Sequence, residues 1–254
     1  MMAFDEQAAI ASFWAARGRG EHFPAEWFDR LSLDDAYRIQ LGMIARRIAQ
    51  GERQIGWKVG LTAPAIQQQF GFHEPVFGCL LQTDASGHVF RRDELIKPGF
   101  ECELCLRISE PLHGDIDMAT ARRAVDVVYP SLEIIETRGD FTAQIAVAIA
   151  DNAQQKTNIL GTPVPLGSLA LETIPVTVQI NGSTVATGTG DAVLGNPLNS
   201  VIWLARKLRE FGRGIQAGDL IMSGSFVRQF PIALGDRVAV DFAGIGTVQT
   251  SMQA

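Results

Sequence analysis

The chain has 254 residues, of which 46% are hydrophobic and 20% are charged, an ordinary composition for a folded globular protein. The formal net charge of −6 argues against a nucleic acid or an anionic membrane surface as a partner, because either would require a basic patch. No apolar run approaches the roughly 20 residues of a membrane span, and the N-terminus lacks a basic start followed by an apolar stretch. We therefore expect a cytoplasmic protein without a secretory signal.

The first fifty residues are predicted to be helical. Apolar residues recur at helical spacing from Ala8 to Trp14, and two glycines then end the pattern. A second helix is predicted to begin after Ser32 as its N-cap, with Asp35 three residues later in the position of a capping box. Gly51 is expected to end this helix.

After residue 55 the pattern becomes typical of β-strands. A short helix is expected to start near Thr62 and to lead into three glutamines, and short strands follow from about residue 76. Asn181-Gly182 is a strong hairpin signal, and Asn196-Pro197 is expected to start one further helix. These patterns predict an α+β protein with a helical N-terminal segment, residues 1–75, and a β-rich domain, residues 76–254, that form one compact unit.

The strongest chemical signal lies between residues 100 and 108. In a β-strand, alternate side chains face opposite ways, so one face of this segment is apolar and the other carries Glu101, Glu103, Cys105 and Arg107. Two carboxylates on one face, two residues apart, can reach a single cation. The alternative is a solvated strand face, where water screens the repulsion between them.

The chain has three cysteines, Cys79, Cys102 and Cys105. An odd, low number does not suggest a disulfide framework, although Cys102 and Cys105 form a C-x-x-C that could be a redox pair or half of a zinc site. Strand alternation places these two side chains on opposite faces, where they cannot share a metal or a disulfide. We therefore expect Cys102 and Cys105 to pack in the core.

Glu133 strengthens the metal interpretation. It lies in the apolar run 131–135, which is predicted to be a buried strand, where a charge is costly unless it is paired or bound to a metal. A salt bridge to Arg138 or Arg107 is the alternative. Three carboxylates suit Mg²⁺ or Mn²⁺ better than zinc. The four histidines are scattered, form no ligand spacing, and are interpreted as surface or loop residues.

Lys58 is a second unusual residue, because the chain has only four lysines against eighteen arginines. On a strand it shares a face with Gly56 and Gly60, which would leave open space beside its ammonium group. A lysine in such a place can hold a carboxylate or transfer a proton. The alternative is an ordinary surface lysine.

An ordered series of motifs runs from about residue 30 to residue 250. The motifs are Gly56-x-Lys58-Val59-Gly60-Leu61-Thr62, Glu74-Pro75-x-Phe77-Gly78, Glu101-x-Glu103, Leu132-Glu133-Ile134, Asp151-Asn152-Ala153, Leu160-Gly161, Gly190-Asp191-Ala192-Val193-Leu194-Gly195-Asn196-Pro197, Ala217-Gly218-Asp219 and Ser223-Gly224-Ser225-Phe226. Together they resemble the 2-oxopent-4-enoate hydratase / 4-oxalocrotonate decarboxylase group of the fumarylacetoacetase-like superfamily. The ordered series is far more specific than any single motif.

This resemblance implies a fold and a set of site residues. The fold would be a mixed β-roll of the fumarylacetoacetase C-terminal-domain type with a helical N-terminal segment, residues 76–254 being the catalytic domain. Mg²⁺ or Mn²⁺ would be held by Glu101, Glu103 and Glu133. The catalytic residues would be Lys58 and, more weakly supported, Asp84. The substrate-binding residues would be Leu61, Thr62, Asp151, Lys156, Ser223, Ser225 and Arg228.

Several of these residues have simpler interpretations. Asp84 could form a turn, Asp151 could cap one, and Lys156 could face water. At Ser225-Phe226 the chain departs from the Gly-Pro pair of the monoacid hydratases and resembles the hydratases of dicarboxylic substrates. If the substrate is dicarboxylic, Arg228 would clamp its distal carboxylate. The stretch between Glu133 and Asp151 is short for that subgroup, however, and a surface arginine is the alternative.

The resemblance implies a hydratase that adds water to a 2-hydroxy-2,4-dienoate or 2-oxo-alkenoate, giving a 4-hydroxy-2-oxo acid in the meta-cleavage catabolism of aromatic compounds. A 4-oxalocrotonate (2-oxo-3-hexenedioate) decarboxylase is the main alternative. An acylpyruvate-type C–C hydrolase comes third, because it would need a His-Glu dyad and His22 with Glu21 lies too early in the chain. The resemblance also implies a homo-oligomer, or a complex with a related decarboxylase or hydratase in which this chain could be a catalytically silent partner.

Overall fold

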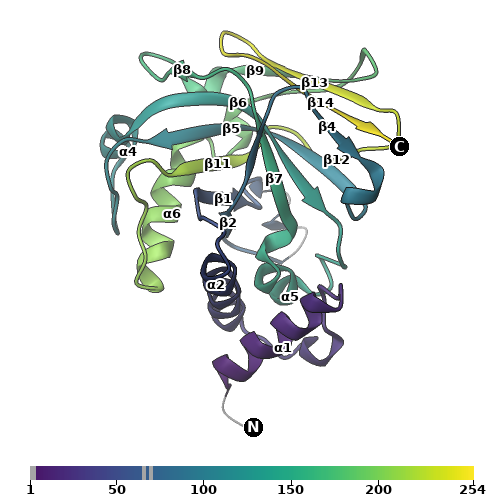
Figure 1. Cartoon of the computed structure of the whole chain (residues 1–254). Coiled ribbons are helices and arrows are strands. Elements are labelled where there is room, and N and C mark those ends of the chain that lie inside the picture. Colours follow the sequence, from purple (N-terminus) through teal and green to yellow (C-terminus); the bar gives the residue numbers. More distant parts are fainter. Residues whose placement is uncertain (1–3, 65–66, 69–70) are drawn as a thin grey trace.

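The computed structural model describes residues 4–64, 67–68 and 71–254. Figure 1 shows the N-terminal helices at one end of the molecule and two β-sheets at the other. The helices longer than one turn of 3₁₀ structure are α1 (Glu6–Gly18), α2 (Leu33–Ala49), α4 (Met118–Ala124), α5 (Ile145–Ala150) and α6 (Leu198–Glu210). None of the helices in these residues is long and apolar enough to cross a membrane.

The larger sheet positions the functional site. Within the described residues it has nine strands, with the order β2-β1-β11-β5-β6-β7-β3, while β12 pairs with β5 and β8 pairs with β6. Its pairing is mixed: β1 is parallel to β11, whereas β5 is antiparallel to both β11 and β6. The strands are β1 (Gly56–Gly60), β2 (Val76–Leu80), β3 (Thr83–Ala85), β5 (Pro98–Ile108), β6 (Val125–Glu136), β7 (Gln155–Leu160), β8 (Val164–Pro165), β11 (Leu220–Ser225) and β12 (Phe230–Pro231).

The second sheet has five strands in the described residues, in the order β10-β9-β13-β14-β4. They are β4 (His88–Arg91), β9 (Pro175–Ile180), β10 (Ser183–Thr189), β13 (Arg237–Phe242) and β14 (Gly246–Gln253). The predicted hairpin joins β9 to β10, and both of its turn residues have positive φ, 54° at Asn181 and 81° at Gly182. A two-residue turn of this kind matches the twist of the paired strands.

Local signals fixed the helix ends as predicted. The Ser32 side chain accepts the Asp35 N–H while the Asp35 carboxylate accepts the Ser32 N–H, which is the expected capping box. The Asn196 side chain accepts the Leu198 N–H at the start of α6. The short helix expected near Thr62 falls partly on residues 65–66 and 69–70, which lie outside the described residues.

All three cysteines are free and buried, which confirms the core packing predicted for Cys102 and Cys105. Cys102 belongs to the main hydrophobic core, whereas Cys105 packs with Leu80 and Met222 in a separate small cluster. The two side chains therefore lie on opposite faces of β5, so the C-x-x-C is neither a redox pair nor half of a zinc site.

The N-terminal segment contributes more than helices. Its strand β1 lies inside the larger sheet, between β2 and β11, and α2 packs against α5 from the middle of the chain. The expected α+β fold, with N-terminal helices and a curled mixed sheet, is confirmed. The division at residue 75 stays a prediction.

Candidate metal centre and active-site cavity

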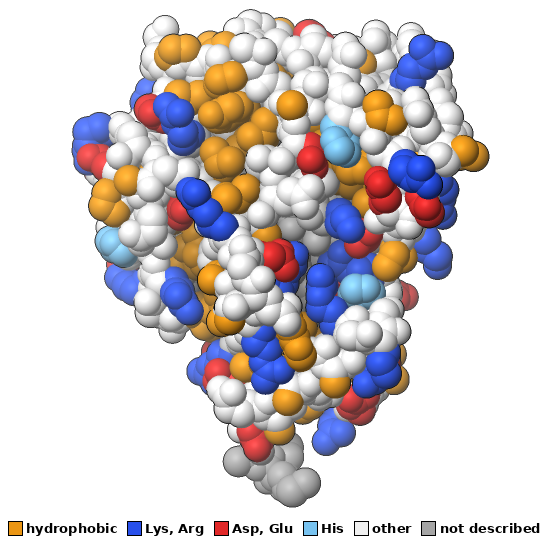
Figure 2. Space-filling model, viewed as in Figure 1, with side chains coloured by type: hydrophobic (Ala, Val, Ile, Leu, Met, Phe, Trp, Pro, Cys, Tyr) orange, Lys and Arg blue, Asp and Glu red, His pale blue; other side chains and the backbone are white. Residues whose placement is uncertain are grey.

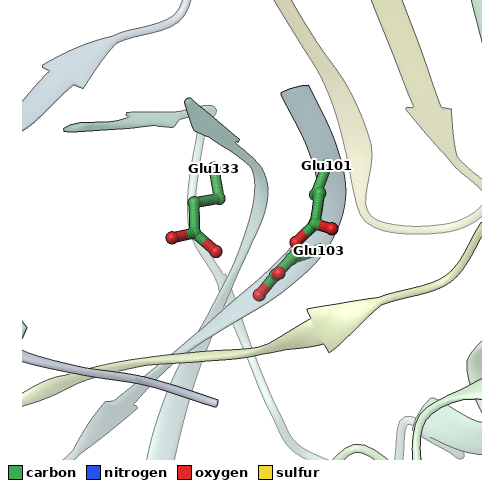
Figure 3. Close-up of side chains that lie close together, drawn as sticks. All are labelled: Glu101, Glu103 and Glu133. Atoms are coloured by element: carbon green, nitrogen blue, oxygen red, sulfur yellow. The ribbon is translucent and has the colours of Figure 1, made fainter. Parts of the chain in front are cut away.

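The three predicted metal ligands come together on one face of two paired strands. Glu101 of β5 lies directly opposite Glu133 of β6 in the antiparallel register, and Glu103 follows two residues later on the same face of β5. One carboxylate oxygen from each side chain lies within 4.8 Å of the other two. Figure 3 shows the three carboxylates near one another, two from one strand and one from its neighbour.

These carboxylates are short of partners. Glu103 and Glu133 are completely buried, and Glu101 is partly buried. One oxygen of Glu103, Oε2, accepts the Gly224 N–H at 2.8 Å. The other oxygen of Glu103 and both oxygens of Glu133 accept no hydrogen bond from any described residue. A solvated strand face is therefore excluded, and buried oxygens of this kind require a cation or a proton.

Lys58 is the ion-pair partner of Glu133. Its side chain is 5% exposed, and Nζ lies 3.5 Å from Glu133 Oε1. The sequence-based alternative, in which Arg138 or Arg107 pairs with Glu133, is wrong. Arg138 binds Glu136 and Asp151, and Arg107 binds Asp126 at the surface; these contacts satisfy both arginines elsewhere.

Glycines make room for Lys58, but they are not the pair that the sequence indicated. A Cβ at Gly60 would lie 3.3 Å from Lys58 Nζ, and a Cβ at Gly78, directly opposite Lys58 on β2, would lie 3.2 Å from Lys58 Cγ. Gly56 has a different role, because a Cβ there would lie 1.9 Å from the Leu220 backbone oxygen. It allows β1 and β11 to approach each other.

Burial controls the protonation of the site. It raises the pKa of Glu133 to about 7; the Glu101 charge adds to the rise and Lys58 opposes it. Burial and then the charges of Glu133 and Glu101 raise the pKa of Glu103 well above its usual range, and burial raises the pKa of Glu101. Burial alone would lower the pKa of Lys58, but the three carboxylates outweigh it, so the pKa is raised and the ammonium stays charged at neutral pH.

The donor set fits a hard divalent cation. Three carboxylates face a single ammonium group, so full ionisation would leave excess negative charge in a buried place. Mg²⁺ and Mn²⁺ prefer oxygen ligands, and the cluster contains neither His nor Cys. The oxygens of Glu103 and Glu133 that accept no hydrogen bond provide the lone pairs that such an ion would use.

A cavity of about 340 Å³ opens beside the carboxylates. Among the predicted site residues, Leu61, Thr62, Ser225 and Arg228 line it together with Lys58 and Glu101. The remaining lining residues are Gly60, Ala63, Val76, Ile135, Phe141, Thr142, Ala153, Gln154, Val227 and Gln229. The wall is mostly apolar, with its charges confined to Lys58, Glu101 and Arg228.

Of the predicted metal ligands only Glu101 lines this cavity, and four of the predicted catalytic and substrate-binding residues do not line it. Asp84 accepts a hydrogen bond from the Thr157 hydroxyl at 2.8 Å and lies 3.6 Å from His88 Nδ1. Asp151 and Lys156 line a second cavity instead. Ser223 is fully buried, and its backbone oxygen accepts the Ser200 hydroxyl at 2.6 Å. This structure therefore shows no contact of Asp84, Asp151, Lys156 or Ser223 with the cavity.

A left-handed turn supplies lining residues that the sequence did not reveal. Asn152, Ala153 and Gln154 have φ values of 58°, 48° and 62°, a run that L-residues rarely adopt. The Asn152 side chain holds this turn, since Oδ1 accepts the Cys79 N–H at 2.7 Å and Nδ2 donates to the Cys79 oxygen at 2.9 Å. Asp151-Asn152-Ala153 had marked the place in the sequence, but no residue pattern indicated its conformation.

Comparison with known proteins agrees with this site. Residues 71–253 match the family described as "Fumarylacetoacetate (FAA) hydrolase C-terminal", and the chain belongs to this family. Within it, the chain belongs with lyases that include both hydratases and decarboxylases.

Three relatives illustrate the likeness. The 2-keto-4-pentenoate hydratase of Paraburkholderia xenovorans is 36% identical over 98% of this chain and 95% of its own length. The 4-oxalocrotonate decarboxylase of a Pseudomonas species is 34% identical over 86% of this chain and 84% of its own. The solved 4-oxalocrotonate decarboxylase of Pseudomonas putida G7, complexed with magnesium and adipate, superimposes with a TM-score of 0.92 at 31% identity, covering 99% of this chain and 100% of its own.

Proposed function

We propose that this protein is a divalent-metal-dependent hydratase. It adds water to a 2-hydroxy-2,4-dienoate or 2-oxo-alkenoate and gives a 4-hydroxy-2-oxo acid. The observation that carries this proposal is the cluster of Glu101, Glu103 and Glu133 beside Lys58, of which Glu101 and Lys58 reach the wall of a cavity sized for a small acid. The relation to 2-keto-4-pentenoate hydratases at 36% identity supports the same reaction.

Glu101, Glu103 and Glu133 would hold Mg²⁺ or Mn²⁺. When bound, such an ion supplies a Lewis acid that stabilises negative charge on the substrate's 2-oxo group, a contribution of several kcal/mol in other enzymes. The Gly224 N–H orients Glu103 for this role through its 2.8 Å hydrogen bond. Because a backbone donor is fixed in place, it limits the carboxylate to a narrow range of positions.

Lys58 would orient the substrate carboxylate and move a proton. Its ammonium is charged, buried and 3.5 Å from Glu133 Oε1. After a small movement of either side chain, the Glu133 carboxylate would accept the Lys58 proton. The apolar wall from Leu61, Val76 and Phe141 packs against the hydrocarbon part of the substrate. It excludes bulk water and so strengthens the interactions between the charged groups.

A decarboxylase of 2-oxo-3-hexenedioate is the second candidate. Two 4-oxalocrotonate decarboxylases match the chain at 34% identity, and a solved decarboxylase gives the high structural similarity described above. Loss of CO₂ from such a substrate places negative charge on the same 2-oxo group, so the same carboxylate cluster would serve. Arg228 on the cavity wall supports a dicarboxylic substrate.

The acylpyruvate-type hydrolase receives less support. Among the described residues no histidine lines the cavity beside the carboxylates, so a His-Glu dyad lacks its histidine there. His22 instead lies 3.5 Å from Asp151 at the second cavity.

The deciding experiment supplies the purified protein with Mg²⁺ and with 2-hydroxypenta-2,4-dienoate or freshly made 2-hydroxymuconate in parallel. Products are identified by NMR, and released CO₂ is measured. Formation of a 4-hydroxy-2-oxo acid without CO₂ establishes the hydratase, whereas CO₂ from the dicarboxylic substrate establishes the decarboxylase. Turnover of neither substrate by the metal-loaded protein refutes both activities and favours the silent-partner or hydrolase alternatives.

A pair of variants tests the metal site in the same assay. Glu101→Gln removes one ligand charge, and we expect it to lower kcat/KM at least 100-fold and to weaken Mg²⁺ binding. Glu110→Gln is the matched control, because the Glu110 carboxylate pairs with Arg123 at the surface. Equal activity of Glu101→Gln and Glu110→Gln would show that the metal assignment is wrong.

A further inference from the structure

A second cavity, of about 370 Å³, lies between the N-terminal helices and the sheet. It shares no lining residue with the cavity beside the carboxylates. Its lining is rich in basic and donor groups, which are Arg17, His22, Arg47, Arg138, Gln155 and Lys156. Figure 2 shows Lys, Arg and His side chains gathered where the narrow helical end meets the broad body of the molecule.

The acidic groups of this second cavity already have partners. Asp151 accepts from Arg138 Nε at 2.5 Å, and Glu136 accepts from Arg138 Nη1 at 2.9 Å. The other two acidic residues of the lining, Asp93 and Glu94, both bind Arg91. Asp93 accepts a hydrogen bond from the Arg91 guanidinium, and Glu94 accepts one from the Arg91 backbone N–H. These contacts use the carboxylates without involving Arg17.

Two donors at the second cavity lack an acceptor. The Arg17 guanidinium makes no hydrogen bond or ion pair with any described residue, although it is only partly exposed. Burial and then the charges of Arg47 and Arg138 lower the pKa of Arg17, and Asp151 opposes that effect. Gln155 is 5% exposed; its Oε1 accepts weakly from Asn152 at 3.5 Å, but its Nε2 has no acceptor. Arg17 remains partly open to solvent, so Gln155 is the buried donor of this pair, and a buried donor without an acceptor is uncommon in folded proteins.

We propose that the second cavity is a binding site for a small oxyanion, a carboxylate or a phosphate, held by the Arg17 guanidinium and the Gln155 amide. An oxyanion offers acceptors to both groups and a counter-charge to Arg17, whereas Arg47 and Arg138 already pair with Glu52, Glu136 and Asp151. Lys156, with Nζ 3.7 Å from Glu136 Oε1 and 40% of its side chain exposed, adds positive charge beside the site. This gives Lys156 a place at the second cavity rather than at the substrate.

The left-handed turn stands between the two cavities. Ala153 and Gln154 line the cavity beside the carboxylates, whereas the flanking residues Asn152 and Gln155 line the second one. Gln155, which would hold the anion, therefore directly follows Gln154, a residue of the candidate active-site wall, in the sequence. The oxyanion site is nevertheless defined by its own residues, and its occupancy does not depend on the proposed reaction.

Titration calorimetry with inorganic phosphate, and separately with succinate, tests the proposal at constant ionic strength maintained with chloride. The metal is removed beforehand by dialysis, because a polycarboxylate chelator would itself compete for the site. We expect saturable binding of at least one oxyanion to the wild-type protein, and the two titrations distinguish phosphate from carboxylate. Arg17→Met should weaken that binding at least tenfold, because a charge-assisted hydrogen bond is lost.

Arg19→Met is the matched control, since Arg19 lies just after the same helix but pairs with Glu21 in solvent. It should change the affinity less than twofold. Arg17→Lys keeps the charge and should bind more tightly than Arg17→Met. The proposal is overturned if neither oxyanion binds saturably, or if Arg17→Met binds within twofold of the wild type. Because no substrate is used, failure here leaves the proposed lyase activity untouched.

Discussion

At the scale of single residues, the contact between Lys58 and Glu133 joins a proposed proton carrier to a proposed metal ligand. The two buried groups lie 3.5 Å apart, and the carboxylate cluster keeps the ammonium charged. Removing a cation from beside a metal site reduces repulsion, whereas removing a proton carrier slows the reaction. A substitution at Lys58 therefore separates metal binding from chemistry.

We expect Lys58→Met to lower kcat by about 10²–10⁴-fold, the usual contribution of a general acid or base. Affinity for Mg²⁺, measured by calorimetry, should be unchanged or higher. Lys97→Met is the control, since Lys97 is exposed and lines neither cavity. A large loss of Mg²⁺ affinity in Lys58→Met would mean that Lys58 holds the carboxylates in place rather than acting on the substrate.

Arg228 is the residue that should discriminate between substrates. Its guanidinium stacks on Phe230, with Cζ 4.0 Å from the ring centroid, and Nη1 donates to the Gln229 oxygen at 3.3 Å. Its other donors remain free to face a distal carboxylate at the cavity wall.

For Arg228→Met we expect KM for dicarboxylic 2-hydroxymuconate to rise at least tenfold. KM for monocarboxylic 2-hydroxypenta-2,4-dienoate should change less than twofold, so this second substrate is the internal control. Steady-state kinetics with both substrates gives the two values. An equal rise for both would show that Arg228 shapes the cavity without recognising the second carboxylate.

At the scale of elements, an irregularity in β11 directs a backbone donor to the metal centre. The pairing of β11 with β5 shifts between Met222 and Ser225, and Gly224 within this interval has φ of 109°. A Cβ at Gly224 would lie 2.4 Å from the Thr62 hydroxyl oxygen. The position therefore requires glycine for both its backbone conformation and its close contact, and its N–H reaches Glu103 as a result.

We expect Gly224→Ala to lower the free energy of unfolding by about 1–3 kcal/mol more than Gly218→Ala. Gly218 also has a positive φ, 91°, but a Cβ there would meet nothing within 4 Å. The pair thus isolates the steric contact from the backbone strain. Urea denaturation gives the free energies, and Gly224→Ala should in addition weaken Mg²⁺ binding. Equal midpoints for the two variants would contradict the packing argument.

At the scale of the whole molecule, the carboxylate cluster should make the free energy of unfolding depend on pH and on bound Mg²⁺. The pKa of Glu133 is about 7 in the folded protein, against about 4.3 for an unfolded chain. The native state therefore binds more protons in this interval. The contribution of Glu133 to stability is fully present below pH 4 and is lost as the pH rises through 7, an effect on the order of 4 kcal/mol.

Urea denaturation of metal-free protein at pH 5 and pH 8 tests this linkage. Wild-type protein should lose more stability than Glu133→Gln between these values, and the difference between the two proteins isolates this group. Mg²⁺ at 100 times its Kd should restore about 2.7 kcal/mol to the wild type at pH 8 and much less to the variant. Parallel pH profiles with no effect of Mg²⁺ would exclude a buried metal-binding carboxylate at position 133.

Much of this arrangement could be predicted from the chain. Strand alternation placed Glu101 and Glu103 on one face, the apolar run around Glu133 indicated burial, and turn and cap residues such as Ser32 marked local boundaries. These signals are local, because the side-chain period of a strand and the hydrogen bonds of a cap are set within a few residues. The ordered motifs then connected the local signals to the fumarylacetoacetase-like fold.

The sequence by itself determined which residues could bind a metal and which general fold would carry them. Only the tertiary structure decided that Glu101 faces Glu133 in register, that Lys58 rather than an arginine pairs with Glu133, and that Asp84 and Lys156 lie away from the cavity. The reason is that strand register and cavity shape depend on contacts between distant segments, as when β1 enters the sheet beside β11. A residue pattern fixes the direction of a side chain along its own strand, but packing against the rest of the chain fixes what that side chain meets.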